Sequence, residues 1–287
     1  MKSIKPFVYT FLFLCLLKGH AQRGLENIIV EKYYVSGTND TLDDRYYGDL
    51  PVGSVTYRIY LDMLPGYKFY AVYGAEGHEL KIETSTLFFN NAYIGNTTPN
   101  VIPRRSLSKN TVMLDSWLSA GAAGEELYGV LKEQDDSMET VIHDKSFLQN
   151  KDKRAGIPVK DRDGLALTDR APVPSFFGID SLVTIFDKKV NGSLLSTTNG
   201  AWGCLGGSMG PDSLTTNRVL IAQLTTNGDL NFELNVQIGK PDVIIERYVA
   251  RNPVQDELTA PFLVYSSKTP KLTATKNKKK SETSQAK

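Results

Sequence analysis

Short runs in which polar and apolar residues alternate recur along most of this chain, and they restrict its fold more than any other feature. In residues 54–63 the alternation puts five large side chains on one face of an extended strand: Val55, Tyr57, Ile59, Leu61 and Met63. Asn-Gly pairs, which suit tight turns, separate several such runs: Asn191, Asn199 and Asn227 begin them. The amphipathic crossover helices of a parallel α/β fold are missing, and residues 123–134 offer at most one or two helical turns between glycines. We therefore expect an all-β, antiparallel β-sandwich or jelly-roll-like fold with long loops.

The clearest single element is a hairpin around Asn227-Gly228, which can adopt the positive φ angles of a type I′ turn. Its register would put alternate residues of two strands on a shared core face: Val219, Ile221, Gln223 and Thr225 opposite Val236, Leu234, Phe232 and Leu230. The other face, with Leu220, Ala222 and Leu224 among polar residues, would meet water or a light covering. A hairpin with one apolar face needs a second layer to cover it.

The domain organisation follows from composition. Residues 1–21 have two early lysines, an apolar run and a small-residue end, which together predict a signal peptide. Residues 22–250 are expected to form the β-sandwich domain, and residues 251–287 a C-terminal extension with a disordered Lys-rich tail. The similarity of "IIVEKY" and "IIERY" favours two strands in equivalent environments. The alternative is a truncated second module that opens near Gly239.

Charge and cysteine content exclude several classes of protein. Without the signal peptide the chain has 30 Lys and Arg against 32 Asp and Glu, and residues 268–287 hold seven of those lysines with one glutamate. The body is therefore acidic, which argues against nucleic acid as a partner. No later segment is apolar enough to span a membrane. Cys204 alone remains after export, so no intramolecular disulfide forms, and a small buried thiol is the simplest interpretation of it.

Catalytic motifs give no assignment. "GHEL" lacks the second histidine of a zinc protease, because residue 82 is Ile. "GGSMG" matches a nucleophile pattern around Ser208, but the required strand before it and helix after it are not expected there. A jelly-roll glycoside hydrolase or another carbohydrate-active enzyme is the alternative function. It would need two carboxylates in one cleft, and the candidates are Asp115, Glu125, Glu126 and Glu83.

Two acidic loops are candidates for calcium, which prefers oxygen ligands from loops of this kind. The first supplies Asp40, Asp43 and Asp44, and the second supplies Asp161 and Asp163. Neither loop fits an EF-hand, and solubility alone also explains acidic surface loops in secreted proteins. Calcium is the one cofactor that the sequence suggests.

Aromatic residues are the candidate binding residues. Eleven of the fourteen tyrosines lie between Tyr33 and Tyr128. Tyrosine favours strands in any case, but its amphipathic ring also stacks on sugars and anchors protein contacts. Core packing does not account for Tyr46 and Tyr47 in a loop, or for Tyr60 on the strand face opposite Ile59. With Trp202 these residues form the predicted binding set.

Several blocks of the sequence stand out within residues 26–238, among them "IIVEKYYVSGTND", "LPVGSVTYRIYLDMLPGYKFYAVYG", "LDSWLSAGAA" and "NGAWGCLGG". In matching order, these blocks resemble an uncharacterised family of secreted β-rich modules found in Bacteroidetes-type extracellular proteins, often type IX-secreted. The resemblance implies an extracellular or cell-surface β-rich module and no catalytic residues. Its usual C-terminal sorting domain is not recognisable here, so the periplasm is the alternative location.

Together these features predict a secreted, non-catalytic binding or structural module of the cell envelope or extracellular matrix. Polysaccharide or another envelope component is the expected partner. The sequence does not determine an oligomeric state.

Overall fold

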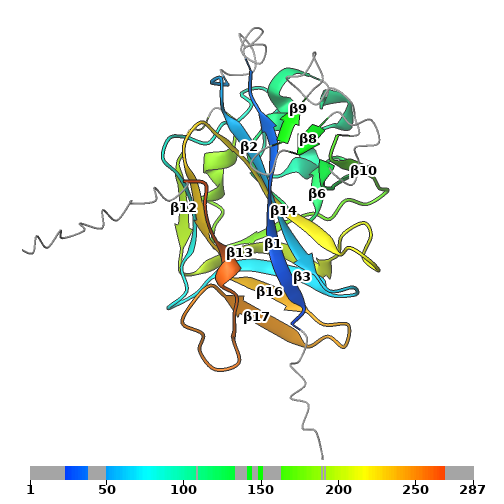
Figure 1. Cartoon of the computed structure of the whole chain (residues 1–287), viewed down its shortest axis with the longest axis vertical. Helices are drawn as coiled ribbons and strands as arrows, with labels where there is room; N and C mark the ends of the chain where they lie inside the picture. The colour runs from blue at the N-terminus through cyan, green and yellow to red at the C-terminus, as the bar shows by residue number, and fades with distance from the viewer. Residues whose placement is uncertain are drawn as a thin grey trace, which may run out of the picture.

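A computed structural model describes the chain over residues 23–37, 50–107, 109–132, 141–143, 148–150, 163–188, 190 and 192–268 (Figure 1). The predicted signal peptide and the Lys-rich end lie outside these residues. The strands are β1 (Leu25–Val35), β2 (Val55–Met63), β3 (Lys68–Gly74), β4 (Leu80–Thr84), β5 (Trp117–Leu118), β6 (Ala122–Gly124), β7 (Leu127–Gly129), β8 (Val141–His143), β9 (Leu148–Asn150), β10 (Leu165–Leu167), β11 (Ser175–Phe177), β12 (Leu194–Thr197), β13 (Gly200–Ser208), β14 (Arg218–Thr226), β15 (Leu230–Glu233), β16 (Val236–Gly239), β17 (Ile245–Val249), β18 (Leu258–Thr259) and β19 (Val264–Ser266). Short 3-10 helices connect some of them: η2 (Pro99–Val101), η3 (Arg104–Ser106), η4 (Asn110–Leu114), η5 (Val183–Phe186) and η6 (Pro261–Leu263).

Two layers of sheet enclose the main core, and this confirms the predicted all-β sandwich. One layer has the strand order β1-β2-β14-β5. The other consists of a six-stranded sheet, β11-β13-β3-β16-β17-β18, and a four-stranded sheet, β12-β4-β15-β19. These two sheets continue into each other, because β12 leads into β13 and β15 leads into β16 after only two residues. Ile59 and Leu61 from the first layer pack with Val72 and Trp202 from the second.

The first sheet is buried on its outer face as well. Tyr60, Trp117 and Leu220 belong to a second apolar cluster that also includes residues of the segment 89–131. That segment carries η2 to η4 and strands β6 and β7, and β10 pairs with β7 to complete a small sheet of order β10-β7-β6. Its approach is close, since a methyl carbon on Gly129 would lie 2.1 Å from Leu220 Cδ2. The expectation that Leu220 meets water or a light covering was wrong: a third, partial layer covers it.

The predicted hairpin at Asn227-Gly228 does not form. Strand β14 pairs with β2 and β5, whereas β15 pairs with β4 and β19, so the chain crosses from one layer to the other at this point. Neither residue is among the positive-φ residues of the described chain. Glycine is needed at residue 228 for space instead, because a side-chain carbon there would lie 2.5 Å from Thr86 Oγ1. Asn199-Gly200 likewise joins β12 to β13 within one bent strand and forms no hairpin.

A bulge in β14 reverses the predicted faces of its second half. Leu220 pairs with Tyr60 and Ala222 pairs with Ile59, which leaves Ile221 as an extra residue. Beyond the bulge Ala222 and Leu224 join the main core. Gln223 turns to the opposite face, where its amide donates to the carbonyl oxygens of Met113 (2.9 Å) and Asp115 (2.7 Å).

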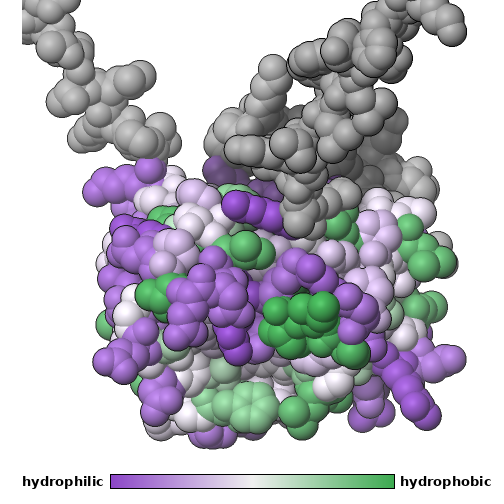
Figure 2. Space-filling view, turned by 90° about the horizontal axis from the view of Figure 1, so that it is seen from below, coloured by the Kyte–Doolittle hydropathy of each residue, from purple (hydrophilic) through white to green (hydrophobic). Residues whose placement is uncertain are grey.

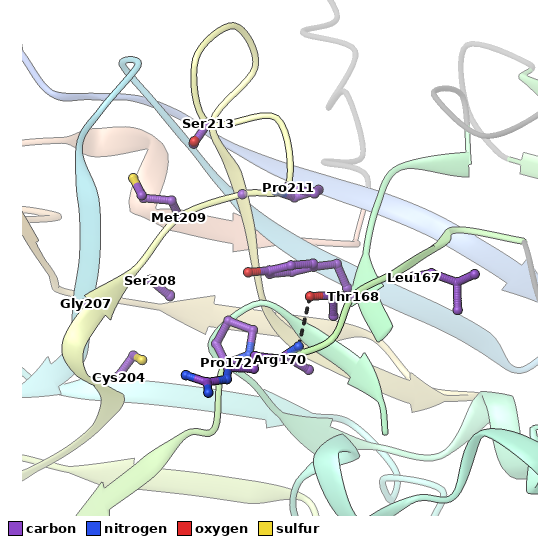
Figure 3. Close-up of a pocket in the computed structure, with 13 residues that line it drawn as sticks. Leu167, Thr168, Arg170, Pro172, Cys204, Gly207, Ser208, Met209, Pro211 and Ser213 are labelled. Carbon is purple, nitrogen blue, oxygen red and sulfur yellow. Dashed lines mark hydrogen bonds between the residues drawn. The ribbon is translucent and has the colours of Figure 1, made fainter. Parts of the chain in front are cut away.

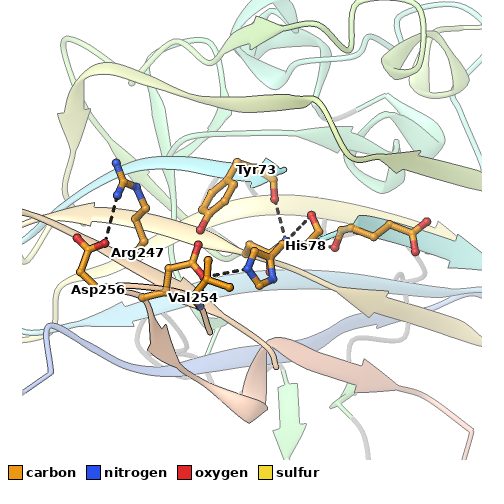
Figure 4. Close-up of polar contacts among 8 residues, drawn as sticks. Tyr73, His78, Arg247, Val254 and Asp256 are labelled. Atoms are coloured by element: carbon orange, nitrogen blue, oxygen red, sulfur yellow. Dashed lines mark hydrogen bonds and ion pairs between the residues drawn. The ribbon is translucent and has the colours of Figure 1, made fainter. Parts of the chain in front are cut away.

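Two further expectations need correction, the first of them only in part. Of the helical candidate 123–134, residues up to 129 belong to the antiparallel β6-β7 pair, whereas Lys132 is helical and residues 133 and 134 lie outside the described residues. The domain also extends beyond residue 250, because β18 pairs with β17 and β19 pairs with β15. Two contacts tie the loop between β17 and β18 to the rest of the fold (Figure 4). Glu257 Oε2 lies 2.8 Å from His78 Nε2, and Asp256 pairs with Arg247.

The region after Gly239 is thus part of the same fold and does not open a second module. Among the residues described, no helix has the length and apolar character needed to cross a membrane.

Candidate functional site

The candidate site begins with a wide bulge in β13. Gly203 pairs with Ala71 and Ser208 pairs with Phe69, so residues 204–207 stand opposite the single residue Tyr70. Gly206 and Gly207 have φ angles of 83° and 77°, a conformation that glycine adopts without strain. The bulge pushes residues 204–207 away from the regular sheet and creates one wall of a groove.

The opposite wall comes from β7 and from the segment that follows β10. Ala166 pairs with Tyr128, which places residues 167–172 beside the Tyr128 side chain. The segment is held at two points: the Arg170 backbone N–H donates to Thr168 Oγ1 (3.2 Å), and Asn100 Nδ2 donates to the Pro172 carbonyl oxygen (2.7 Å). These hydrogen bonds fix the backbone of the wall from which the Arg170 side chain extends.

The groove between these walls has a volume of about 610 Å³, within the range of small-molecule sites. In Figure 3 Thr168, Arg170 and Pro172 lie across the groove from Cys204, Gly207 and Met209. The lining residues are Tyr128, Leu167, Thr168, Arg170, Ala171, Pro172, Cys204, Gly207, Ser208, Met209, Gly210, Pro211 and Ser213.

The chemistry of the lining is hydroxyl-rich with one cation. Tyr128, Thr168 and Ser213 bring hydroxyl groups, and Arg170 brings a guanidinium. Burial raises the pKa of the Tyr128 hydroxyl, and burial also raises the pKa of the Cys204 thiol. Both groups are therefore neutral near pH 7, so the thiol is a poor nucleophile and the phenol remains a hydrogen-bond donor.

A second tyrosine adjoins the groove on the outer face of the six-stranded sheet. The ring of Tyr70 rests between Gly207 of β13 and Gly239 of β16: a carbon added at Gly239 would lie 2.4 Å from its Cε2, and one added at Gly207 would lie 3.2 Å from its Cζ. A side chain at Gly239 would displace the ring, whereas one at Gly207 would first meet the Lys68 side chain, at 2.8 Å from its Cβ. Tyr70 is half-buried, so its remaining surface is open to contact.

The predicted aromatic binding residues are not at this groove. Tyr60 and Trp202 are fully buried. The Tyr60 hydroxyl donates to the Val130 carbonyl oxygen (2.8 Å), and Trp202 Nε1 lies 3.2 Å from the carbonyl oxygens of Ser119 and Ile221. Their assignment as surface binding residues was wrong, because each ring fills a core and satisfies its polar atom within the protein. Tyr46 and Tyr47 lie outside the described residues.

The proposed calcium ligands are not brought together in the part of the chain that the structure describes. Asp40, Asp43, Asp44 and Asp161 fall outside it, and the backbone carbonyl oxygen of Asp163 accepts a hydrogen bond from the Tyr33 hydroxyl (2.6 Å). The described residues hold no group of three or more His, Cys, Asp or Glu side chains that could bind a metal. Calcium stays a prediction from sequence.

The four carboxylates suggested for a hydrolase have different roles. Asp115 is fully buried, and its two oxygens accept the backbone N–H groups of Asn91 (2.7 Å) and Asn96 (2.9 Å). Glu83 pairs with Lys81 on the surface of β4 (2.8 Å). The remaining two, Glu125 and Glu126, are exposed at the β6-β7 turn. None of the four lines the groove.

Ser208 of the "GGSMG" motif lies at the end of β13, and a loop rather than a helix follows it. Its side chain is 5% exposed, and its Oγ is shielded from solvent without a hydrogen-bond partner among the described residues. No histidine lines the groove beside it. The serine therefore lacks both the accessible oxygen and the adjacent base of an activated nucleophile.

The groove residues Tyr128 and Arg170 were not selected from the sequence. The one local signal was the double glycine at residues 206 and 207 within a strand pattern, since glycine in a strand often marks a bulge. The opposite wall of the groove comes from Tyr128 and from residues 167–172, which lie far from residues 206 and 207 along the chain, and no periodicity predicts that they meet.

Comparisons of the chain with protein-family models, with curated proteins and with solved structures found no match.

Proposed function

We propose that this protein is a secreted, non-catalytic binding module of the cell envelope or extracellular matrix, and that its groove at Tyr128 holds a sugar residue of a polysaccharide. The observation that carries the proposal is the groove itself, which combines an aromatic ring with several hydroxyl groups in a volume of about 610 Å³. Sugars offer apolar C–H faces for an aromatic ring and hydroxyl groups for polar partners. Export and the extracellular location rest on the predicted signal peptide.

The surface beside the groove supports a long, polar ligand. Tyr70 lies close to Gly207, which lines the groove: a carbon added at Gly207 would lie 3.2 Å from Cζ of the Tyr70 ring. A neighbouring sugar of the same chain could rest on Tyr70. On the one face of the molecule that Figure 2 shows, apolar residues form separate patches between hydrophilic ones.

The test is glycan binding by the full mature chain and by two variants of Tyr128. A glycan array would identify ligands, and titration calorimetry would measure their affinity. Tyr128→Ala should weaken binding roughly tenfold, since an aromatic contact contributes about 1 kcal/mol beyond its buried area. Tyr128→Phe should keep most of the affinity, because it retains the ring.

Tyr93→Ala is the matched control, since Tyr93 is a 63% exposed tyrosine that does not line the groove. It should bind as the unmodified protein does. An array without a glycan ligand, or full affinity in Tyr128→Ala, would contradict the proposal and favour a purely structural module. Release of reducing sugar from a bound polysaccharide would instead identify an enzyme.

A further inference from the structure

We infer that the ligand of the groove carries negatively charged oxygen atoms, as the carboxylates or sulfates of an acidic polysaccharide do. This inference rests on the proposed function, because it specifies the class of sugar that the groove would hold. Carboxylate and sulfate share the chemistry that matters here, a planar or tetrahedral anion that accepts two hydrogen bonds from one guanidinium.

The first step is the charge of the lining. Arg170 is the one Asp, Glu, Lys, Arg or His side chain among the residues that line the groove. The groove therefore carries a single positive charge and no negative one. This is unusual for the body of the protein, where acidic residues outnumber basic ones.

The second step is that Arg170 is uncommitted. Three arginines of the described chain are paired with carboxylates: Arg218 with Asp62, Arg247 with Asp256 and Arg251 with Glu233. Within the described residues, the Arg170 guanidinium forms no ion pair, and only its backbone N–H makes a hydrogen bond. A guanidinium at a concave site without a protein partner is available to an anion of a ligand.

The third step is the hydroxyl next to it. Thr168 Oγ1 accepts the backbone N–H of Arg170 (3.2 Å), which Figure 3 shows as a dashed line. Because Oγ1 already accepts this bond, the hydroxyl proton is free to donate in another direction. Thr168 and Arg170 thus supply donors from adjacent positions on one wall, as recognition of an oxyanion requires.

The fourth step is preorganisation. Residues 168–172 are anchored by the Thr168 bond and by the bond from Asn100 to Pro172. Binding of an anion here therefore costs the conformational entropy of one side chain and not that of a whole loop. This makes a lone arginine on this wall a better anion site than an arginine on an unsupported loop.

The experiment compares short oligosaccharides that differ only in charge, by titration calorimetry with the full mature chain. One pair is trigalacturonate and its methyl ester, and the other is a sulfated disaccharide and its unsulfated form. Short ligands are needed because residues 268–287 carry seven lysines, which attract long sulfated polymers regardless of the groove. We expect at least tenfold tighter binding of the charged member of one pair.

Arg170→Gln should abolish this preference, and Arg170→Lys should retain part of it because the charge remains while bidentate bonding is lost. Arg251→Gln is the control, since it removes the same charge at a residue that does not line the groove, and it should keep the full preference. Preference for trigalacturonate alone identifies a carboxylate ligand, and preference for the sulfated sugar alone identifies a sulfate ligand.

Equal affinity for charged and neutral members, or an unchanged preference in Arg170→Gln, overturns the inference. If neutral sugars then still bind in a Tyr128-dependent manner, the proposed function stands without it. If no charged or neutral sugar binds at all, the inference and the proposed function fail together.

Discussion

The guanidinium carbon of Arg58 lies 3.6 Å from the centroid of the Tyr33 ring, beneath the third layer of the fold. Arg58 is 1% exposed. Its Nε donates to Gln223 Oε1 (2.8 Å), and one terminal nitrogen donates to the Gly164 carbonyl oxygen (2.7 Å). Through a cation–π contact and two buried hydrogen bonds, Arg58 on β2 thus connects β1, β14 and the residue before β10 in the third layer.

Replacement of Arg58 by Met should lower the free energy of unfolding by about 3–5 kcal/mol, the range for loss of one member of a buried charged network. The cause is that the side chain of Gln223 and the carbonyl oxygen of Gly164, both buried, would lose their donor. Urea denaturation followed by circular dichroism measures the change. The surface variant Arg251→Gln should lose less than about 1 kcal/mol, and a similar small loss in Arg58→Met would show that the network is not structural.

Tyr265 makes stability depend on pH in the alkaline range. It stacks on Phe232, with ring centroids 5.2 Å apart, and burial raises the pKa of its hydroxyl to about 12. The unfolded chain loses this proton near the ordinary pKa of about 10, so between these values the folded state binds more protons than the unfolded state. The stabilising contribution is therefore complete below pH 10 and is lost as pH rises through 12.

The Tyr265→Phe variant should show a weaker decline in unfolding free energy between pH 10 and pH 12 than the unmodified protein does. Urea unfolding at several pH values measures both slopes. Tyr73, whose pKa burial also raises to about 12, would still contribute in both proteins. Identical slopes in the two proteins would mean that Tyr265 is not buried as described.

We expect the segment after residue 250 to be needed for stability. Leu263 is fully buried in the main core, whereas its neighbour Val264 is 41% exposed. Leu263→Ala should lower the free energy of unfolding by about 2–5 kcal/mol, and Val264→Ala by less than about 1 kcal/mol. Thermal unfolding of both variants tests this, and equal small effects would place residues after 250 outside the domain.

Ser208 should be dispensable for stability and for binding. Its hydroxyl is buried without a partner in the described chain, so its removal in Ser208→Ala costs no hydrogen bond. The free energy of unfolding should change by less than about 0.5 kcal/mol or increase. Denaturant unfolding measures this, and any hydrolytic activity that disappeared in Ser208→Ala would restore the nucleophile interpretation.

The fold class was predictable because alternation of polar and apolar residues depends only on local side-chain direction. In β2 that pattern correctly placed Ile59 and Leu61 in the main core. The same pattern predicted that Tyr60 lies on an exposed face, and this was wrong. A strand that is covered on both faces still shows alternation when tyrosines and polar residues line its second face. The sequence of β2 alone does not distinguish a solvent-facing tyrosine from one beneath another layer.

The two errors around β14 have different physical causes. The Asn227-Gly228 pair permits a tight turn but does not require one. In the structure the crossover is held by hydrogen bonds between the Thr226 hydroxyl and the hydroxyls of Thr84 (2.7 Å) and Thr86 (2.9 Å). The bulge at Ile221 shifted the register by one residue, and a shift of one residue exchanges the faces of all residues beyond it. The groove was not predictable for a further reason: its walls meet only through long-range contacts between β13 and the segment after β10.

Because β2 and β14 are covered on both sides, almost every position along them is constrained by packing, and little sequence variation is compatible with folding there. Packing constrains the bulge of β13 and the wall at residues 168–172 much less. Leu205 in the bulge is 75% exposed, and within the described residues the Arg170 side chain forms no hydrogen bond or ion pair. Related proteins with this architecture should therefore differ most at these few rim positions. Changes of ligand preference can accumulate at the rim without loss of the scaffold.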